Sequence, residues 1–181
     1  MTPTYVVERA RLFASAAHAA VGQRRKYTLE SYIVHPAEVV GLVRSVQHTD
    51  EMLAAAWLHD VVEDTKVEIA QIRAEFGETV ARLVSAVTDI SLPEDGNRAV
   101  RKTIDRDHLA CAPAQAKTIK LADLISNSRS ILARDRAFAM VYIQEKAALL
   151  DVLRDGNPSL HAVAARIVAD ALERFGEAEQ A

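Results

Sequence analysis

Apolar residues recur every three to four positions along most of the chain, which is the pattern of amphipathic helices. Between Glu8 and Val21, for example, Leu12, Phe13 and Ala16 share one face, and Gly22 follows as a stop signal. Further helices are predicted over about 36–47, 68–76, 79–89, 99–109 and 158–176. Another helix starts at Asp50 and carries 59–65 near its end. A long helix after Pro113 carries 119–127. A further helix, capped by Asp135, is expected to turn these residues inward: Phe138, Val141, Tyr142, Leu149 and Leu150.

No alternation with a period of two competes with this pattern, so the predicted fold class is all-α. The segment 90–97, which reads ISLPEDGN, is turn chemistry and too short to be a domain linker. We therefore expect a single domain over residues 1–181. Its motif-bearing part spans about 18–127, and the helices at 135–176 complete the bundle.

Composition narrows the class of protein. Half of the residues are hydrophobic but only 5% are aromatic, so small aliphatic side chains fill the core. One cysteine, Cys111, and the lack of an export signal or a long apolar run indicate a cytoplasmic protein that does not cross a membrane. The net charge of −3 disfavours broad nucleic-acid binding. Apolar helix faces left at the surface would allow a homodimer.

Four residues from three segments are candidate metal ligands, namely His35, the adjacent pair His59 and Asp60, and Asp123. Neighbouring side chains on a helix diverge by about 100°, so the pair can bind one ion but cannot complete its shell. His35 at the mouth of a helix and Asp123 inside an apolar helix supply donors where packing residues would be expected. Two imidazoles with two carboxylates suit manganese, iron or zinc, and such a site can generate hydroxide near neutral pH.

Two acids lie beside the adjacent pair. Glu63 follows His59 by four residues, and Asp64 follows Asp60 by four, so both lie one helical turn further along the same face. One acid could take a proton from an attacking water while the other supports the leaving group or a metal ligand. A lone His-Asp pair is weak evidence, but its combination with HDxxED and a downstream KLAD, followed by Asn127, is specific.

These blocks resemble a known family. The segments YIVHP, AAAWLHDVVEDT, FGETVARLVSAVTD and TIKLADLISN are similar to those of the HD-domain alarmone hydrolases, both the hydrolase half of the RelA/SpoT homologues and the stand-alone small alarmone hydrolases. The resemblance runs from about His18 to Asn127. It implies an HD-domain helical bundle that uses Mn²⁺ to remove pyrophosphate from the 3′ position of guanosine tetra- or pentaphosphate.

The resemblance also assigns roles. It implies His35, His59, Asp60 and Asp123 as metal ligands, and Glu63 and Asp64 as catalytic acids acting on the water. It further implies Arg25, Lys26 and Asn127 as substrate contacts, with the arginine against the base. A planar guanidinium can stack on a purine and a lysine can neutralise phosphate, so these assignments are physically reasonable. His18 is the further histidine best placed to support the site through a hydrogen bond.

The sequence departs from the family after VTD, where the segment 90–110 lacks the expected lysine-rich stretch. The basic residues there, Arg98, Arg101 and Lys102, can line the phosphate side or simply face solvent, and the same holds for Lys120. Base preference and polyphosphate length therefore stay open. Alternatives are another nucleotide substrate (an adenine alarmone, a nucleoside monophosphate or a dinucleotide 2′-phosphate) and a non-catalytic nucleotide-binding module.

Overall fold

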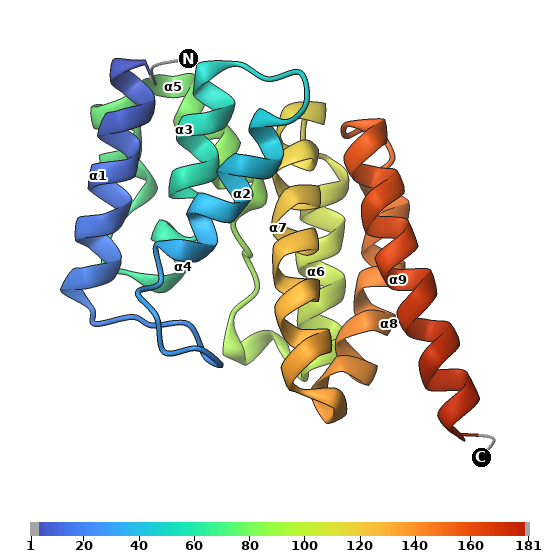
Figure 1. The fold of residues 1–181 in the computed structure, drawn as a ribbon. Helices are drawn as coiled ribbons and strands as arrows, with labels where there is room; N and C mark the ends of the chain where they lie inside the picture. The colour runs from blue at the N-terminus through green and yellow to red at the C-terminus, as the bar shows by residue number, and fades with distance from the viewer. Residues whose placement is uncertain (1–3, 180–181) are drawn as a thin grey trace.

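The computed structural model describes residues 4–179, and helices dominate this part of the chain (Figure 1). The helices are α1 (Tyr5–Ala20), α2 (Val34–Arg44), α3 (Asp50–Leu58), α4 (Val61–Asp64), α5 (Ile69–Val87), the short 3₁₀ turn η1 (Pro93–Asp95), α6 (Arg98–Ala110), α7 (Ala114–Arg134), α8 (Arg136–Val152) and α9 (Pro158–Glu179). The predicted all-α fold is confirmed. None of these helices combines the length and apolar character needed to span a membrane.

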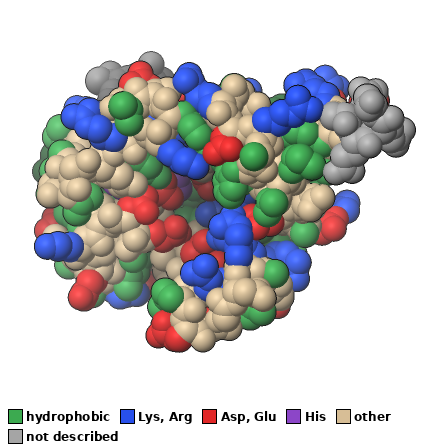
Figure 2. Space-filling view, turned by 90° about the horizontal axis from the view of Figure 1, so that it is seen from below, with side chains coloured by type: hydrophobic (Ala, Val, Ile, Leu, Met, Phe, Trp, Pro, Cys, Tyr) green, Lys and Arg blue, Asp and Glu red, His purple; other side chains and the backbone are tan. Residues whose placement is uncertain are grey.

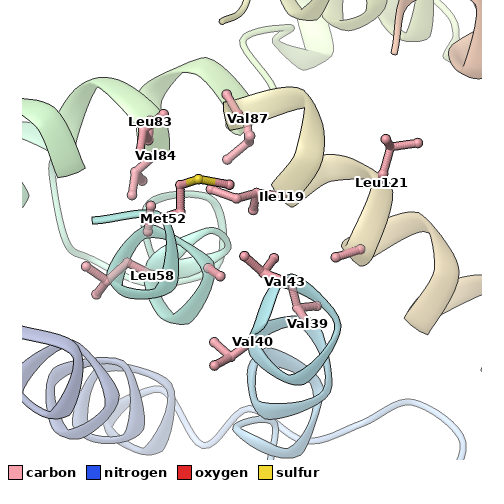
Figure 3. Packing of buried hydrophobic residues seen from close by; sticks show 14 of the residues in the cluster. Val39, Val40, Val43, Met52, Leu58, Leu83, Val84, Val87, Ile119 and Leu121 are labelled. Atoms are coloured by element: carbon pink, nitrogen blue, oxygen red, sulfur yellow. The ribbon is translucent and has the colours of Figure 1, made fainter. Parts of the chain in front are cut away.

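Two helices form the centre of the bundle. All residues of α3 from Met52 to Leu58 are buried, and a helix that is apolar on every side is stable only when other helices surround it. Helix α3 contacts α1, α2, α5 and α7, and α7 in turn contacts α2, α5, α8 and α9. Figure 3 shows valines of α2 and residues of α3, α5 and α7 packed into one apolar cluster.

The third helix differs from the prediction in a way that matters for chemistry. It is capped by Thr49, whose hydroxyl accepts from the backbone N–H of Met52, and not by Asp50. It also ends at Leu58, because His59 and Asp60 form a turn and a separate short helix, α4, begins at Val61. The sequence could not show this break, because the helical spacing of apolar residues continues across it.

Other boundaries follow local chemistry. Gly77 adopts φ 85° and kinks α5, as the two predicted helices on either side of it require, and the Asp135 carboxylate caps α8 by accepting from the backbone N–H of Phe138. Helix α9 continues past Gly176 to Glu179, further than predicted. Val141 was expected to face inward, but it is 50% exposed because it lines a cavity between α6 and α8.

Gly156 offers a test of the packing between α7 and the α8–α9 turn. A Cβ at this position would lie 2.7 Å from Cδ1 of Leu121 and 3.1 Å from the carbonyl oxygen of Leu153. We expect Gly156→Ala to lower the free energy of unfolding by about 1–3 kcal/mol, measured by chemical denaturation. Gly41→Ala is the control, because Gly41 is an exposed position of α2 and a Cβ there meets nothing within 4 Å. It should stabilise by up to about 1 kcal/mol, and equal effects of the two changes would contradict the packing described.

Candidate metal centre

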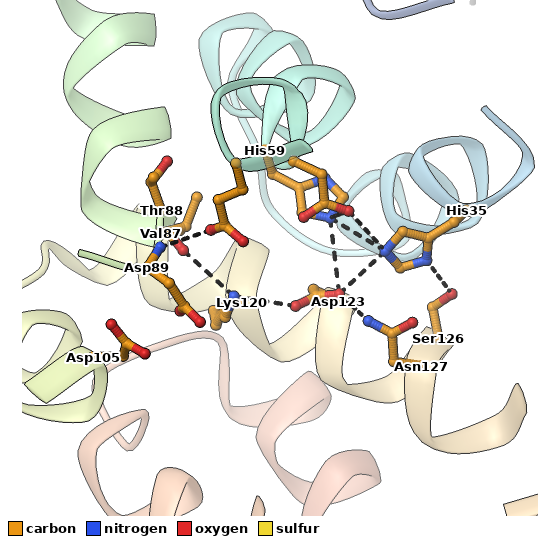
Figure 4. Close-up of polar contacts among 12 residues, drawn as sticks. His35, His59, Val87, Thr88, Asp89, Asp105, Lys120, Asp123, Ser126 and Asn127 are labelled. Atoms are coloured by element: carbon orange, nitrogen blue, oxygen red, sulfur yellow. Dashed lines mark hydrogen bonds and ion pairs between the residues drawn. The ribbon is translucent and has the colours of Figure 1, made fainter. Parts of the chain in front are cut away.

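The four predicted metal ligands converge on one buried point, where Figure 4 shows His35, His59 and Asp123. His35 lies in the first turn of α2, His59 and Asp60 lie in the turn between α3 and α4, and Asp123 lies in the middle of α7. Their residues are between 0% and 8% exposed. Burying two imidazoles and two carboxylates together is costly unless each is satisfied by a partner, so the cluster calls for a functional explanation.

The distances within the cluster match ligands around a single ion. Nε2 of His35 lies 3.2 Å from Nε2 of His59 and 3.2 Å from Oδ1 of Asp123, while Nε2 of His59 lies 3.8 Å from that same oxygen. Donors bonded at about 2.1 Å to one ion, at right to tetrahedral angles, lie about 3.0–3.4 Å apart. His35, His59 and Asp123 therefore form a candidate metal site, with all their ligand atoms within 4.8 Å of one another.

Asp60 adjoins this group. Its Oδ2 lies 3.1 Å from Nε2 of His59 and 3.5 Å from Nε2 of His35, and it accepts a hydrogen bond from the Tyr32 hydroxyl at 2.6 Å. Burial, and then the negative charge of Asp60, raise the pKa of Tyr32, so the phenol stays protonated and keeps donating. Asp123 has a comparable support, because the side-chain amide of Asn127 donates to its Oδ1 at 2.7 Å.

The position of the ring hydrogen on His59 shows why the cluster needs a cation. Nδ1 of His59 lies 2.9 Å from the carbonyl oxygen of Ala56, which can only accept, so Nδ1 carries the hydrogen. In the neutral ring, Nε2 then presents a lone pair to the carboxylate oxygens of Asp60 and Asp123 and to the ring of His35. Electron-pair donors facing one another at this range repel unless a proton or a metal ion lies between them.

The electrostatics of the cluster agree with this reading. Burial on its own lowers the pKa of His59, but the carboxylates of Asp60 and Asp123 outweigh it, and the net shift is well upward. Burial likewise favours the neutral form of Asp123, yet Lys120 and the two imidazoles hold its pKa well below the usual range. The cluster thus attracts positive charge, and protons and a metal ion compete for the same lone pairs.

Glu63 and Asp64 both lie beside the cluster on α4. Oε1 of Glu63 accepts from the backbone N–H of Asp89 at 2.7 Å. Water reaches Glu63, but protein atoms crowd its carboxyl, and this desolvation raises its pKa to about 7 against the pull of Lys120. Oδ2 of Asp64 accepts from the side-chain amide of Gln23 at 2.8 Å.

His18 supports this second acid, as expected of a histidine near the site. It is 2% exposed, its Nδ1 lies 2.6 Å from Oε1 of Gln23, and its ring packs 4.7 Å from that of Tyr32. Gln23 and Tyr32 were not singled out from the sequence. Only their positions in the sequence could have pointed to a role in the site, because Gln23 directly precedes the basic run and Tyr32 lies within YIVHP.

Lys120, which the sequence left open between phosphate and solvent, faces inward. Its Nζ lies 3.4 Å from Oδ2 of Asp123 and its side chain is 14% exposed. Burial lowers the pKa of Lys120, but the carboxylates of Asp123, Glu63 and Asp89 more than reverse this, so it stays charged. Asp89, at the end of VTD, was also not anticipated as a site residue.

A cavity of about 480 Å³ opens beside Lys120, between the end of α5 and helices α6 and α8. Seen from below, the molecule has a hollow around which acidic and basic side chains gather (Figure 2). Within the cavity, Nζ of Lys102 lies 2.7 Å from Oδ2 of Asp89, and Arg98 forms a two-pronged ion pair with Glu145. The sequence left Arg98, Arg101 and Lys102 open between phosphate and solvent. Arg98 and Lys102 line this cavity, whereas Arg101 does not.

Lys146 enters the same cavity from α8. It packs over the ring of Tyr142, and among the described side chains, residues 4–176, it has no hydrogen-bond or ion-pair partner. Burial, and then the charge of Lys120, lower its pKa to about 8. The ammonium is therefore still charged at neutral pH and free to bind an anion.

The predicted substrate contacts lie on the other side of Asp123. An N–H of the Arg25 guanidinium donates to Oδ1 of Asn127 at 3.3 Å, so Arg25, Asn127 and Asp123 form a continuous chain. Arg25 also lines a second cavity, of about 540 Å³, between the loop that follows α1 and helices α2 and α7. Lys26 instead points to Asp135, 3.2 Å away, and is not brought to the metal cluster.

Comparisons with known proteins agree with this geometry. A family model described as HD domain matches residues 10–149. A probable guanosine-3′,5′-bis(diphosphate) 3′-pyrophosphohydrolase of Synechocystis is 38% identical over 132 residues, which are 71% of this chain and 17% of that relative. The guanosine-3′,5′-bis(diphosphate) 3′-pyrophosphohydrolase MESH1 of Danio rerio is 42% identical over 106 residues, 55% of each chain.

A solved structure extends the similarity to almost the whole chain. A metazoan ortholog of SpoT, which hydrolyses ppGpp and plays a role in starvation responses, superimposes with a TM-score of 0.83 at 28% identity. The match covers 94% of this chain and 97% of that one. By contrast, the chain spans less than two thirds of the length of either curated relative named above.

The family match runs from α1 into α8 and so includes every helix that carries a candidate ligand. The resemblance seen in the sequence is confirmed, and the chain belongs to the HD-domain family.

Proposed function

We propose that the protein is a metal-dependent phosphohydrolase that removes pyrophosphate from the 3′ position of a guanosine tetra- or pentaphosphate, with Mn²⁺ as its ion. The observation that carries the proposal is the convergence of His35, His59, Asp60 and Asp123 beside a carboxyl group, Glu63, whose pKa is about 7. The comparisons support the choice of substrate, because relatives that share the fold are named for this reaction or hydrolyse ppGpp.

The metal ligands and the two acids can be assigned separate catalytic roles. A divalent ion held by the four ligands would polarise a phosphoryl oxygen and acidify a nearby water. Glu63 is positioned to take the proton as the water oxygen bonds to the phosphorus next to the ribose, while the bond from that phosphorus to O3′ breaks. Asp64, which accepts from Gln23, is the second acid, and the proton that Glu63 takes from the water would pass to O3′ directly or through Asp64. Pyrophosphate and a nucleotide with a free 3′ hydroxyl are then the products.

The surroundings suit a substrate with two different ends. Lys102, Lys120 and Lys146 line the cavity on one side of Asp123, where phosphate groups could be neutralised. Arg25 lines the cavity on the other side, where its planar guanidinium could stack on a purine and Asn127 could contact the nucleotide. Lys26 would reach the substrate only after leaving Asp135.

The direct test is an assay of purified protein with ppGpp and Mn²⁺ in which both possible products are measured. We expect pyrophosphate, with little orthophosphate, and we expect a chelator to abolish the reaction and added Mn²⁺ to restore it. Asp123→Asn should lower the rate by roughly 10²-fold or more, because a ligand and its charge are lost. Orthophosphate release from a monophosphate or a dinucleotide would instead identify a different substrate, and absence of turnover at saturating metal would refute the hydrolase.

The raised pKa of Glu63 predicts an acidic limb in the pH profile. As a base Glu63 must be ionised, so kcat/KM should fall about tenfold per unit as the pH drops below the carboxyl's pKa of about 7. Glu63→Gln should lower kcat by roughly 10²–10⁴-fold and remove this limb. Glu68→Gln, on an exposed glutamate at the start of α5, is the control. An unchanged acidic limb in Glu63→Gln would assign the base to another group.

Lys146 tests the assignment of the α6–α8 cavity to phosphate. A charge-assisted hydrogen bond contributes about 1.5–3 kcal/mol, so Lys146→Met should raise KM for ppGpp by roughly 10–100-fold. Because Lys146 does not contact the metal ligands, kcat should stay within about 2-fold of wild type. Lys66→Met, on an exposed lysine outside the cavity, is the matched control. Equal KM values for the two variants would place the phosphates elsewhere.

A further inference from the structure

The two imidazoles of the metal site are held by different kinds of partner. Nδ1 of His59 meets the backbone carbonyl of Ala56, a group that helix α3 fixes in place. Nδ1 of His35 instead lies 3.0 Å from the hydroxyl oxygen of Ser126 on α7 (Figure 4). A hydroxyl can either donate or accept, so the Ser126 contact alone does not decide which nitrogen of His35 carries the hydrogen.

Glu38 removes this ambiguity. The Ser126 hydroxyl donates to Oε2 of Glu38 at 2.6 Å. An ionised carboxylate can only accept, and a hydroxyl has only one hydrogen, so the Ser126 oxygen is left to accept from Nδ1–H of His35. The neutral ring then has its lone pair at Nε2, the atom that lies 3.2 Å from both His59 and Asp123.

We propose that Ser126 and Glu38 are positioning residues that set the tautomer and the ring orientation of His35 for metal binding. The inference rests on the proposed metal-dependent function but concerns residues that neither the sequence analysis nor the comparisons assign. Without the carboxylate, the hydroxyl can turn and donate to Nδ1, which stabilises the other tautomer. That tautomer carries its hydrogen at Nε2, where it blocks the coordination position.

The placement of the two residues supports this role. Ser126 follows Asp123 by three residues on α7, and Glu38 follows His35 by three on α2, so each support lies one turn from a ligand on the same helix face. Helices α2 and α7 pack against each other, which brings the two pairs together. Ser126 is 3% exposed, so water does not compete strongly for its hydrogen bonds, whereas Glu38 is exposed and lines the cavity that contains Arg25.

The experiment measures Mn²⁺ affinity by titration calorimetry on protein stripped of metal, without substrate. Partners of metal-binding histidines typically contribute 10–100-fold to affinity, so Ser126→Ala should weaken Mn²⁺ binding by about that factor. Ser126→Thr keeps the hydroxyl and should bind within about 3-fold of wild type. Ser128→Ala is the matched control, because Ser128 is also buried on α7 but faces Tyr142. The melting temperature of each metal-free variant reports on folding separately.

Glu38 supplies an independent variant on an exposed position, where folding is not at risk. Glu38→Ala should weaken Mn²⁺ binding by about 5-fold, the equivalent of one hydrogen bond, while Glu30→Ala in the same cavity should have no effect. Ser126→Ala within about 2-fold of wild type would overturn the proposal, as would equal affinities of the Glu38 and Glu30 variants. A wild-type protein that does not bind Mn²⁺ would instead refute the proposed metal-dependent function.

Discussion

The site depends on a buried cluster of imidazole nitrogens and carboxylate oxygens that have more lone pairs than hydrogens to share between them. The one ring hydrogen of neutral His59, at Nδ1, is donated to the carbonyl oxygen of Ala56, and Nε2 faces Asp60, Asp123 and a second imidazole. Such a set repels itself unless positive charge enters it. The raised pKa of His59 and the lowered pKa of Asp123 express the same requirement, because protons and metal ions meet the same need.

Helical spacing lets a small number of elements build this set. On α7, Lys120, Ser126 and Asn127 each lie three or four residues from Asp123 and therefore flank it on one helix face. This face carries a ligand, an ammonium on one side of it, and two polar supports on the other side. The turn between α3 and α4 adds two adjacent ligands, because the break in the helix lets both point to the same centre. The remainder of the bundle holds these two segments against α2.

Much of this could be predicted from the sequence, because the ligands are rare residue types in otherwise apolar helices. His35, His59 and Asp123 stood out for that reason, and the structure brings them together. The break at His59 could not be predicted, because α4 continues the spacing of α3. Nor could Glu38, Ser126 or Gln23 be recognised, since a polar residue near a motif acquires meaning only when its partner across the bundle is known. Lys26 was singled out from the sequence, but the structure holds it away from the metal cluster, because it pairs with Asp135, the residue that caps α8.

The charges in the α6–α8 cavity bear on which anions can enter it. Lys102 is already paired with Asp89, and Lys120 with Asp123, so a phosphate gains their help only by competing with a carboxylate. Of these three lysines, Lys146 alone has no such partner among the side chains described, those of residues 4–176. A single phosphate would gain little from this arrangement, whereas a chain of phosphates could bind Lys146 and draw the paired lysines at the same time. If the protein acts as proposed, this shared use of lysines favours a polyphosphate over a single inorganic phosphate.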